Sequence, residues 1–337
     1  MESSLTSANV YSKKRLIYTP FMLSLTLLFV TALLSLSVGS VNIPLKDIFH
    51  GFLGKEVQNW EIIMYLRLPR IVTSIIVGAN LAVAGVLLQA VMQNPLVDPG
   101  ITGVSSGASV LAILVMLYLP QYTLLLPIIS FFGGLFAALI VYALAWKNGL
   151  SPVRIVLAGV AVNAFLGSIS SILAILNSDK IAGVLMWLNG SIAGRNWKHV
   201  TILLIYSPMF LVLALLASKA CNLISLGEKN ALSIGTNVNL TRFLISIIAI
   251  FLASISTCVV GIIGFLALVA PHISRMIVGS NHKYLIPFSM VLGSNILLLA
   301  DTLSRSIAKP YEIPVGITMS MFGGPFFIYL LRRRLRK

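Results

Sequence analysis

The sequence predicts an all-α integral membrane protein, and two observations carry that prediction. Of its 337 residues, 58% are hydrophobic and only 10% are charged, whereas a soluble domain carries roughly 25% charged residues. The apolar residues also form long continuous runs, and one membrane span needs about 20 of them. Only helices and closed barrels satisfy the backbone in lipid, and a barrel would alternate in polarity. We therefore expect a single polytopic transmembrane domain over residues 1–337.

Ten apolar runs are long enough to be membrane spans. They cover residues 16–38, 70–92, 100–119, 123–146, 153–176, 198–217, 240–260, 262–278, 284–303 and 313–331. The eighth run is short, and Pro271 predicts a break in it. With the tail 1–15 and the C-terminus inside, cytoplasmic segments hold fifteen of the 24 Lys and Arg residues and outer segments hold nine. The positive-inside rule therefore predicts a multi-pass protein of the cell membrane with both termini cytoplasmic.

The stretch from Arg67 to Ser109 contains the most informative local pattern. Proline lacks an N–H and disfavours helix in the residue before it, so Asn94-Pro95 predicts the end of the second span. Asp98 fits an N-cap, and Pro99 fits the first helical position of the next span. The sequence thus predicts a structural turn formed by Asn94, Pro95, Asp98 and Pro99.

This stretch contains the R-L-P-R motif at residues 67–70, the G-x-x-L-Q-x-x-x-x-N-P-L-x-x-P turn at 85–99 and the G-V-S-x-G-A run at 103–108. These motifs resemble the FecCD-type permease family. Further matches follow in order at residues 187–191, 261–275, 312–316 and 323–327. The family comprises the membrane subunits of type II ABC importers for iron–siderophores, haem and cobalamin. The resemblance implies that permease fold, with ten transmembrane helices, and an iron–siderophore as the commonest cargo.

The sequence offers little to power transport by itself. Ion-coupled transporters need ionisable groups deep in the bilayer, yet of the nine acidic residues only Asp301 falls within a predicted span. No G-x-x-x-x-G-K-[ST] phosphate-binding loop occurs either. We expect a transport subunit that is not an enzyme and binds no cofactor, with ATP–Mg held by a cytoplasmic ABC ATPase dimer. The alternatives are an ion-coupled secondary transporter and an intramembrane enzyme, for which no catalytic constellation is visible.

A short segment within about 221–238 is the candidate contact to such an ATPase. Glu228, Ala231 and Gly235 lie at offsets of 0, 3 and 7, on or near one helical face. An interfacial helix lying on lipid headgroups is the alternative. The arrangement resembles the coupling helices of the family, which insert into the ATPase. The resemblance implies coupling residues Leu226, Gly227, Glu228, Ala231 and Gly235.

Three arginines mark the predicted outer rim. Arg67 and Arg70 stand just before the second span, and Arg305 follows Asp301 near the end of the ninth. Arginines at helix ends commonly extend to lipid phosphates. In FecCD-type permeases, arginines in the motifs R-L-P-R and A-D-x-x-x-R face glutamates on the two lobes of an extracytoplasmic substrate-binding protein. The resemblance therefore implies docking through these arginines, with Asp301 expected to orient Arg305 or to cap its helix.

The expected cargo path also follows from the resemblance. It implies that the fifth and tenth spans line a path between two permease subunits, identical or homologous, although small and hydroxylated residues also favour plain helix packing. The candidate path and gate residues are Ser151, Pro152, Val153, Asn163, Ser168, Ser171, Thr318 and Ser320. The gate turn departs from the cobalamin permease, which has small hydroxylated residues where Pro152 and Val153 stand here.

No metal site is expected in this chain. The four histidines at positions 50, 199, 272 and 282 lack the spacing of metal ligands. The two cysteines, Cys221 and Cys258, form no disulfide framework. The net charge of +15 is explained by anionic inner-leaflet lipid rather than by nucleic acid. The cargo is predicted to be an iron–siderophore, with cobalamin or haem as the alternative.

Overall fold

The computed structural model describes residues 2–39, 41–55, 57–147, 149–307 and 311–334, and the elements in these ranges are helices. Each of the ten predicted spans overlaps one longer helix. These helices are α1 (Glu2–Ser37), α3 (Leu68–Val91), α4 (Val104–Tyr118), α5 (Leu126–Ala145), α6 (Pro152–Leu176), α8 (Trp197–Leu216), α11 (Val238–Val260), α12 (Leu266–Val278), α13 (His282–Ile307) and α14 (Val315–Arg334).

Seven helical segments in the described ranges are long and apolar enough to cross a membrane, and α4, α12 and α14 are shorter apolar helices. The remaining helices are short: α2 (Leu45–Phe52), α7 (Ile181–Leu188), α9 (Ser218–Ser225) and α10 (Glu228–Ser233). Single 3₁₀ or π turns complete the described chain as η1 (Ile62–Arg67), η2 (Pro99–Thr102), η3 (Pro120–Leu125) and η4 (Ser178–Lys180). The multi-pass character predicted from the sequence is therefore confirmed.

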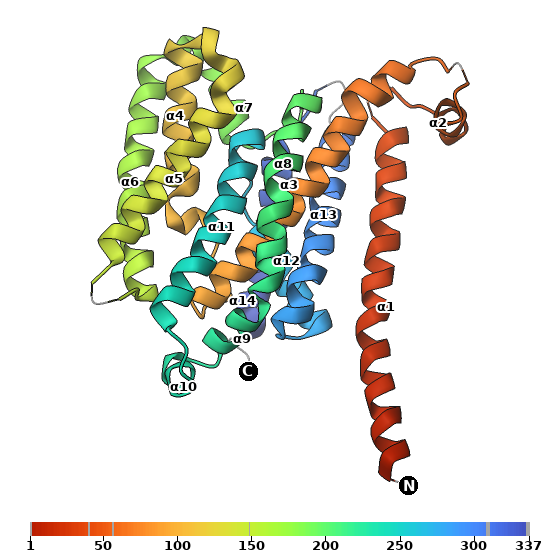
Figure 1. Cartoon of the computed structure of the whole chain (residues 1–337). Coiled ribbons are helices and arrows are strands. Elements are labelled where there is room, and N and C mark those ends of the chain that lie inside the picture. The colour runs from red at the N-terminus through yellow and green to blue at the C-terminus, as the bar shows by residue number, and fades with distance from the viewer. Residues whose placement is uncertain (1, 40, 56, 148, 308–310, 335–337) are drawn as a thin grey trace.

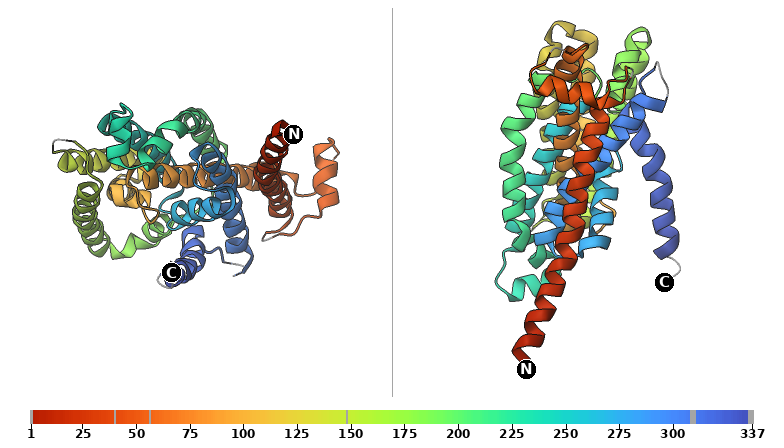
Figure 2. Two further views of the ribbon diagram at one scale, coloured as in Figure 1. Left: turned by 90° about the horizontal axis from the view of Figure 1, so that it is seen from below. Right: turned by 90° about the vertical axis from the view of Figure 1, so that its right-hand side faces the viewer.

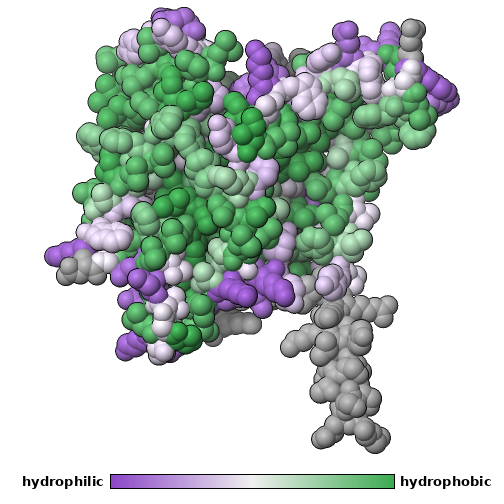
Figure 3. Space-filling view, in the orientation of Figure 1, coloured by the Kyte–Doolittle hydropathy of each residue, from purple (hydrophilic) through white to green (hydrophobic). Residues whose placement is uncertain are grey.

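The helices form a bundle with α3 at its centre (Figures 1 and 2). Helix α3 packs against α8, α11, α12 and α13, whereas α1 and α6 lie at the edges. Apolar side chains cover the middle of the face in Figure 3, and polar side chains gather at its two ends. Helix α2 lies at one end and α10 at the other (Figure 1); we call these the α2 end and the α10 end. Helix α1 begins and α14 finishes towards the α10 end.

The contact between α3 and α12 explains how a proline is accommodated inside a helix. The predicted break at Pro271 is wrong, because α12 continues through this residue. A proline cannot donate to the carbonyl four residues earlier, which here belongs to Ala267. That carbonyl instead lies 3.4 Å from the Gln89 side-chain nitrogen of α3. Gly85 lets the two helices approach, since a Cβ at this position would lie 1.9 Å from the same oxygen.

The R-L-P-R motif lies inside a helix rather than before one, which corrects the predicted start of the second span. The π turn η1 runs directly into α3, and Pro69 occupies the first turn of α3. In this register the Leu68 N–H bonds to the Ile63 carbonyl, five residues back. Pro69 cannot donate in the same register, and the Met64 carbonyl that it would have bonded instead accepts from the Trp197 ring N–H at 2.8 Å. The helical segment therefore begins at Ile62 and carries Arg67 and Arg70 on it.

Three glycine-containing motifs meet where helices are interrupted. The Gly316 N–H at the start of α14 donates to the Gly190 carbonyl after α7, and the Ser191 N–H donates to the Val260 carbonyl. A Cβ at Gly261 would lie 2.1 Å from the Trp187 carbonyl oxygen. Irregular backbone is tolerated in a membrane protein only where protein groups satisfy it. These motifs thus bond to one another and fix α14 against the bundle.

The α3–α12 contact predicts a strong cost for a side chain at Gly85. Replacing Gly85 with Ala forces a methyl group against backbone, and overpacking typically costs about 1–3 kcal/mol. The matched control is Gly167→Ala in α6, where an added Cβ meets nothing within 4 Å. We expect the Gly85 variant to lose folded yield and melting temperature in fluorescence-detected size-exclusion chromatography, while the control holds both. Equal behaviour of the two variants would contradict the packing argument.

Candidate functional site

The predicted structural turn between α3 and α4 forms as a proline-stabilised connection. Helix α3 ends at Val91, and the Asn94 side chain accepts a hydrogen bond from the Leu96 N–H at 3.0 Å. Asp98 caps the 3₁₀ turn η2 by accepting from the Gly100 N–H at 2.7 Å. Asp98 and Pro99 therefore start η2 rather than α4, which begins only after Gly103 takes a positive φ of 82°. Asp98 is therefore an N-cap, as predicted, but it caps η2 rather than the following helix α4.

A buried ion network ties α3 to α13 near the α2 end. The Arg70 guanidinium donates to both carboxylate oxygens of Asp301, with Nε–Oδ2 and Nη2–Oδ1 distances of 2.9 Å. A third nitrogen, Nη1, lies 2.8 Å from Glu312 Oε2 in the segment before α14. The Asp301 side chain is fully buried, and that of Glu312 is 39% exposed. The Asp301 carboxylate bonds to Arg70, so among the described residues any influence of Asp301 on Arg305 acts without a direct hydrogen bond.

Arg67 and Arg305 bond to the C-terminal end of α1 and the chain that follows it. Arg67 donates to the carbonyls of Leu36, Ser37 and Val41, and Arg305 donates to the Ser35 carbonyl and hydroxyl. Gly39 lies between the two guanidinium groups, since a Cβ there would be 3.2 Å from Arg67 and 3.5 Å from Arg305.

The structure thus brings the three predicted docking arginines together at the α2 end. It also buries them, with exposed fractions of 4% for Arg67, 9% for Arg70 and 5% for Arg305. Each guanidinium bonds to its own chain. Direct contact with another protein would require a guanidinium to leave these partners, so docking through these arginines remains a prediction.

The candidate coupling segment, residues 226–235, projects from the α10 end (Figure 1). Positive φ angles at Gly227 (95°) and Gly235 (82°) turn the chain on either side of α10. The prediction of one shared helical face is wrong, because α10 ends before Gly235 and Ala231 is fully buried. Glu228 is 58% exposed, yet its carboxylate bonds to Arg242 of α11 at 3.1 Å.

Apolar side chains supply the exposed part of this segment. Leu226, Leu232 and Ile234 are 54%, 55% and 60% exposed. Sequence reasoning named only Leu226, because the small-residue pattern drew attention to Ala231 and Gly235 instead. The i, i+2 spacing of Leu232 and Ile234 gives no helical signal, so only their exposure in the folded chain identifies them.

The candidate path residues of α6 divide into bonded and exposed groups. The Asn163 side chain accepts from the Ser106 hydroxyl at 2.7 Å and donates to the Gly100 carbonyl at 2.9 Å, which ties α6 to α4 and η2. Ser168 and Ser171 are exposed, and their hydroxyls donate to carbonyls one turn earlier. Pro152 and exposed Val153 start α6, with Ser151 at its N-cap.

Helix α14 shows the same division. Thr318 is buried and its hydroxyl lies 2.7 Å from that of Ser304 in α13, so it serves helix packing. Ser320 is exposed. Helices α6, α7 and α14 lie along one edge of the molecule seen from below (Figure 2). The exposed sides of α6 and α14 therefore belong to one edge of the chain.

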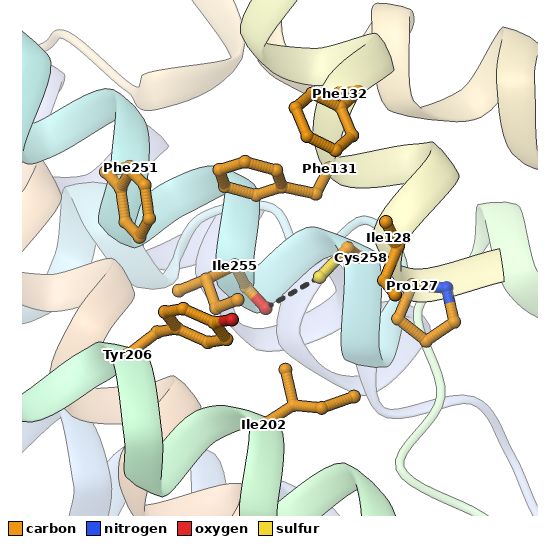
Figure 4. Close-up of a pocket in the computed structure, with 9 residues that line it drawn as sticks. All are labelled: Pro127, Ile128, Phe131, Phe132, Ile202, Tyr206, Phe251, Ile255 and Cys258. Carbon is orange, nitrogen blue, oxygen red and sulfur yellow. Dashed lines mark hydrogen bonds between the residues drawn. The ribbon is translucent and has the colours of Figure 1, made fainter. Parts of the chain in front are cut away.

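An apolar cavity of about 270 Å³ lies between α5, α8 and α11 (Figure 4). Phe131, Phe251 and Ile255 contribute to its wall, and the Cys258 thiol at its floor donates to the Ile255 carbonyl at 3.1 Å. Ile128 and Phe132 at its rim are 52% and 59% exposed. The residues that line this cavity include none of the candidate path residues.

The bundle of long apolar helices, with polar side chains gathered at its two ends (Figure 3), defines a multi-pass membrane protein. The FecCD transport family model matches residues 27–333, so the chain belongs to the FecCD transport family. It is 39% identical to the Fe(3+)-citrate import system permease protein YfmD of Bacillus subtilis (strain 168), over 97% of this chain and 98% of that protein. It is also 39% identical to the heme-iron transport system permease protein IsdF of Staphylococcus aureus (strain Newman), over 96% and 97%.

A solved structure agrees with this assignment. An inward-facing structure described as a metal-chelate type ABC transporter superimposes with a TM-score of 0.82 at 29% identity, covering 95% of this chain and 99% of that one. The predicted type II ABC importer permease fold is therefore confirmed. As a permease subunit of that family, the chain is a transport protein and not itself an enzyme.

The ion network predicts unequal roles for the two acids bound to Arg70. Asp301→Asn leaves the buried Arg70 guanidinium without its fully buried anionic partner, and breaking such a pair costs about 3–5 kcal/mol. Glu312→Gln removes a half-exposed partner and should cost about 0–1 kcal/mol. Thermal melting of each purified variant in detergent separates the two outcomes. Equal small shifts would show that the pair does not hold α3 to α13.

Proposed function

We propose that this chain is the membrane permease subunit of an ATP-driven importer that carries iron–siderophore complexes into the cytoplasm. The family match over 27–333 is the observation that carries the proposal. The related citrate and heme-iron permeases both move iron complexes. The whole chain acts as one permease domain in the cell membrane. Its α10 end and both termini face the cytoplasm, as the excess of Lys and Arg there favours.

A cytoplasmic ABC ATPase dimer supplies the energy in this proposal. ATP–Mg binds to that partner, and this chain binds no cofactor of its own. The exposed leucines and isoleucine of residues 226–235 offer an apolar contact for a groove of the ATPase, and exposed apolar side chains of this kind mark protein contacts. Glu228 fixes the segment through its ion pair with Arg242. Gly227 turns the backbone before α10 through its positive φ.

Ion coupling, the rival mechanism, finds little support. Within the described candidate spans the single acidic residue is Asp301, and its carboxylate is held by Arg70 at 2.9 Å. A proton or sodium carrier needs an acidic group that can exchange its partner during transport. A buried acid already paired with an arginine is poorly suited to that role.

A second permease subunit, identical or homologous, completes the path. The exposed sides of α6 and α14 face it, with Ser168, Ser171 and Ser320 on the path side and the turn at Ser151, Pro152 and Val153 as the gate. Asn163 and Thr318 position these helices through their internal bonds. A weakly polar wall suits a large chelate, because no strong site retains it.

A substrate-binding protein delivers cargo at the α2 end. Because Arg67, Arg70 and Arg305 are buried and bonded within the chain, we assign them to fixing the docking rim. Salt bridges to glutamates of the binding protein then require these side chains to exchange partners. Glu312, 39% exposed beside Arg70, is the residue of the network nearest to solvent.

Docking of the ATPase predicts a specific defect. Ile234→Glu places a charge in the apolar contact and should weaken ATPase binding by at least about 1 kcal/mol, which is about fivefold. Lys219→Glu, an exposed polar change on α9, is the matched control. Co-purification of the ATPase with each variant, quantified against the unsubstituted chain, measures the effect. Unchanged recovery with the Ile234 variant would place the contact elsewhere.

Cargo transport is tested in proteoliposomes that contain the full importer. We expect accumulation of a ferric siderophore only with ATP and binding protein present, and none with the permease and an ion gradient alone. In parallel experiments, haem or cobalamin replaces the ferric siderophore, and the same binding protein, encoded beside the permease, is used. Uptake of haem or cobalamin in place of the ferric chelate would support the importer function and contradict the proposed cargo.

A further inference from the structure

A single buried arginine joins the coupling segment to the turn that precedes α6. Arg242, in the first turns of α11, donates from one nitrogen, Nη1, to Glu228 Oε2 at 3.1 Å and to the Leu150 carbonyl at 3.0 Å. Its side chain is 3% exposed. Glu228 is the first residue of α10, and Leu150 lies two residues before α6 begins at Pro152.

The described residues between α5 and α6 make further contacts with α11. The Leu150 N–H donates to the Asn239 side chain at 3.1 Å, so both backbone groups of Leu150 bond to α11 side chains. The Trp146 ring packs edge-on against Phe243 with centroids 6.0 Å apart. Leu150 is 2% exposed. The turn therefore cannot move away from the start of α11 without breaking several buried contacts.

The same turn is stiff within itself. Arg154 of α6 donates to the Lys147 carbonyl at 2.6 Å and to the Gly149 carbonyl at 2.8 Å. Gly149 has a φ of 113°, which favours glycine, and a Cβ there would lie 2.6 Å from the Asn239 amide. A displacement of Leu150 is thus passed to the first turn of α6 rather than absorbed in a flexible loop.

We propose that Arg242 is the positioning residue that transmits movement of the 226–235 segment to residues 149–151 and so to α6. This inference rests on the proposed function, since it assumes that an ATPase moves the coupling segment. Glu228 is the input, because it is on α10 and exposed at the docking surface. Leu150 is the output, because it directly precedes the helix that faces the path.

The geometry favours this link over an effect through the neighbouring elements. Gly227 and Gly235 interrupt the helical backbone on both sides of α10. A displacement of α10 is therefore transmitted only weakly along the backbone to α9 and α11. Ala231 is buried and its carbonyl accepts from the Thr236 N–H at 3.1 Å, which keeps the segment compact. The segment is compact, and its Glu228 carboxylate forms the ion pair with the buried Arg242. Displacement of the segment therefore displaces Arg242.

The test uses the assembled importer with a thiol reporter at Val153, which is 66% exposed on the first turn of α6. Both native cysteines are buried, and burial raises the pKa of the Cys221 thiol to about 12. Within this chain, a soluble maleimide therefore labels Val153→Cys selectively, and its labelling is read on the separated permease subunit. The labelling rate is measured with and without a non-hydrolysable ATP analogue, alongside ATP hydrolysis and cargo uptake.

We expect Arg242→Gln to retain ATP hydrolysis while its nucleotide-dependent change in labelling and its uptake fall by about 2- to 30-fold, the usual range for loss of a coupling residue. Arg242→Lys keeps the charge and should recover part of both. Thr241→Ala, in the same turn of α11 with its hydroxyl bonded to the Asn237 carbonyl, should match the unsubstituted importer. A normal labelling change in Arg242→Gln would overturn the proposal.

Two further outcomes are separable. If Arg242→Gln fails to assemble, Glu228→Gln at the exposed end of the pair provides the same comparison, and normal coupling in that variant overturns the link. Constant labelling of Val153→Cys in the otherwise unsubstituted, active importer would also overturn it. Absence of ATP-dependent uptake in the unsubstituted importer would instead count against the proposed function.

Discussion

The lack of water in the hydrocarbon core constrains every part of this structure, because each backbone polar group there needs a partner within the protein. Continuous helices meet that need locally. The interruptions meet it between segments: the Ala267 carbonyl freed by Pro271 lies beside Gln89, and the Gly316 N–H bonds to the Gly190 carbonyl. Glycines such as Gly85 allow the close approach that these bonds require. The interruptions are therefore fixed contacts between helices rather than weak points.

Charged side chains in the interior also need partners within the protein. Near the α2 end, Arg70 and Asp301 satisfy each other in the interior, and Arg67 and Arg305 bond to the carbonyls near the end of α1. Near the α10 end, Arg242 bonds to Glu228 and to a backbone carbonyl. An arginine presents several donors in a fixed plane, so it can join two or three segments at once. Buried arginines thus tie together elements that are far apart in the sequence at both ends of the bundle.

Hydropathy was sufficient to place the ten apolar helices along the chain, and seven described helical segments are long and apolar enough to cross a membrane. Ends were less accurate: the second helical segment begins at Ile62 rather than near residue 70, and α12 continues through Pro271, where a break was predicted. The candidate site was predicted by motif, and the motifs singled out Arg70 and Glu228 without indicating the residues to which they bond in the structure. Asp301 and Arg242 pair with residues 231 and 14 positions away. No periodicity within one helix encodes such pairs, because they depend on which helices become neighbours.

The two arginine centres differ in a way that bears on transport. At the α2 end, Arg70 is held by a fully buried acid, so that centre favours one arrangement of α3, α13 and the segment before α14. At the α10 end, Arg242 is held by a mostly exposed acid on a short helix flanked by glycines. An exposed partner can be displaced by a docking protein at far lower cost than a buried one. In the proposed importer, the chain therefore combines a more rigid rim at the α2 end, where the binding protein would dock, with a more responsive connection at the α10 end, where the ATPase would dock, and α6 begins directly beside that connection.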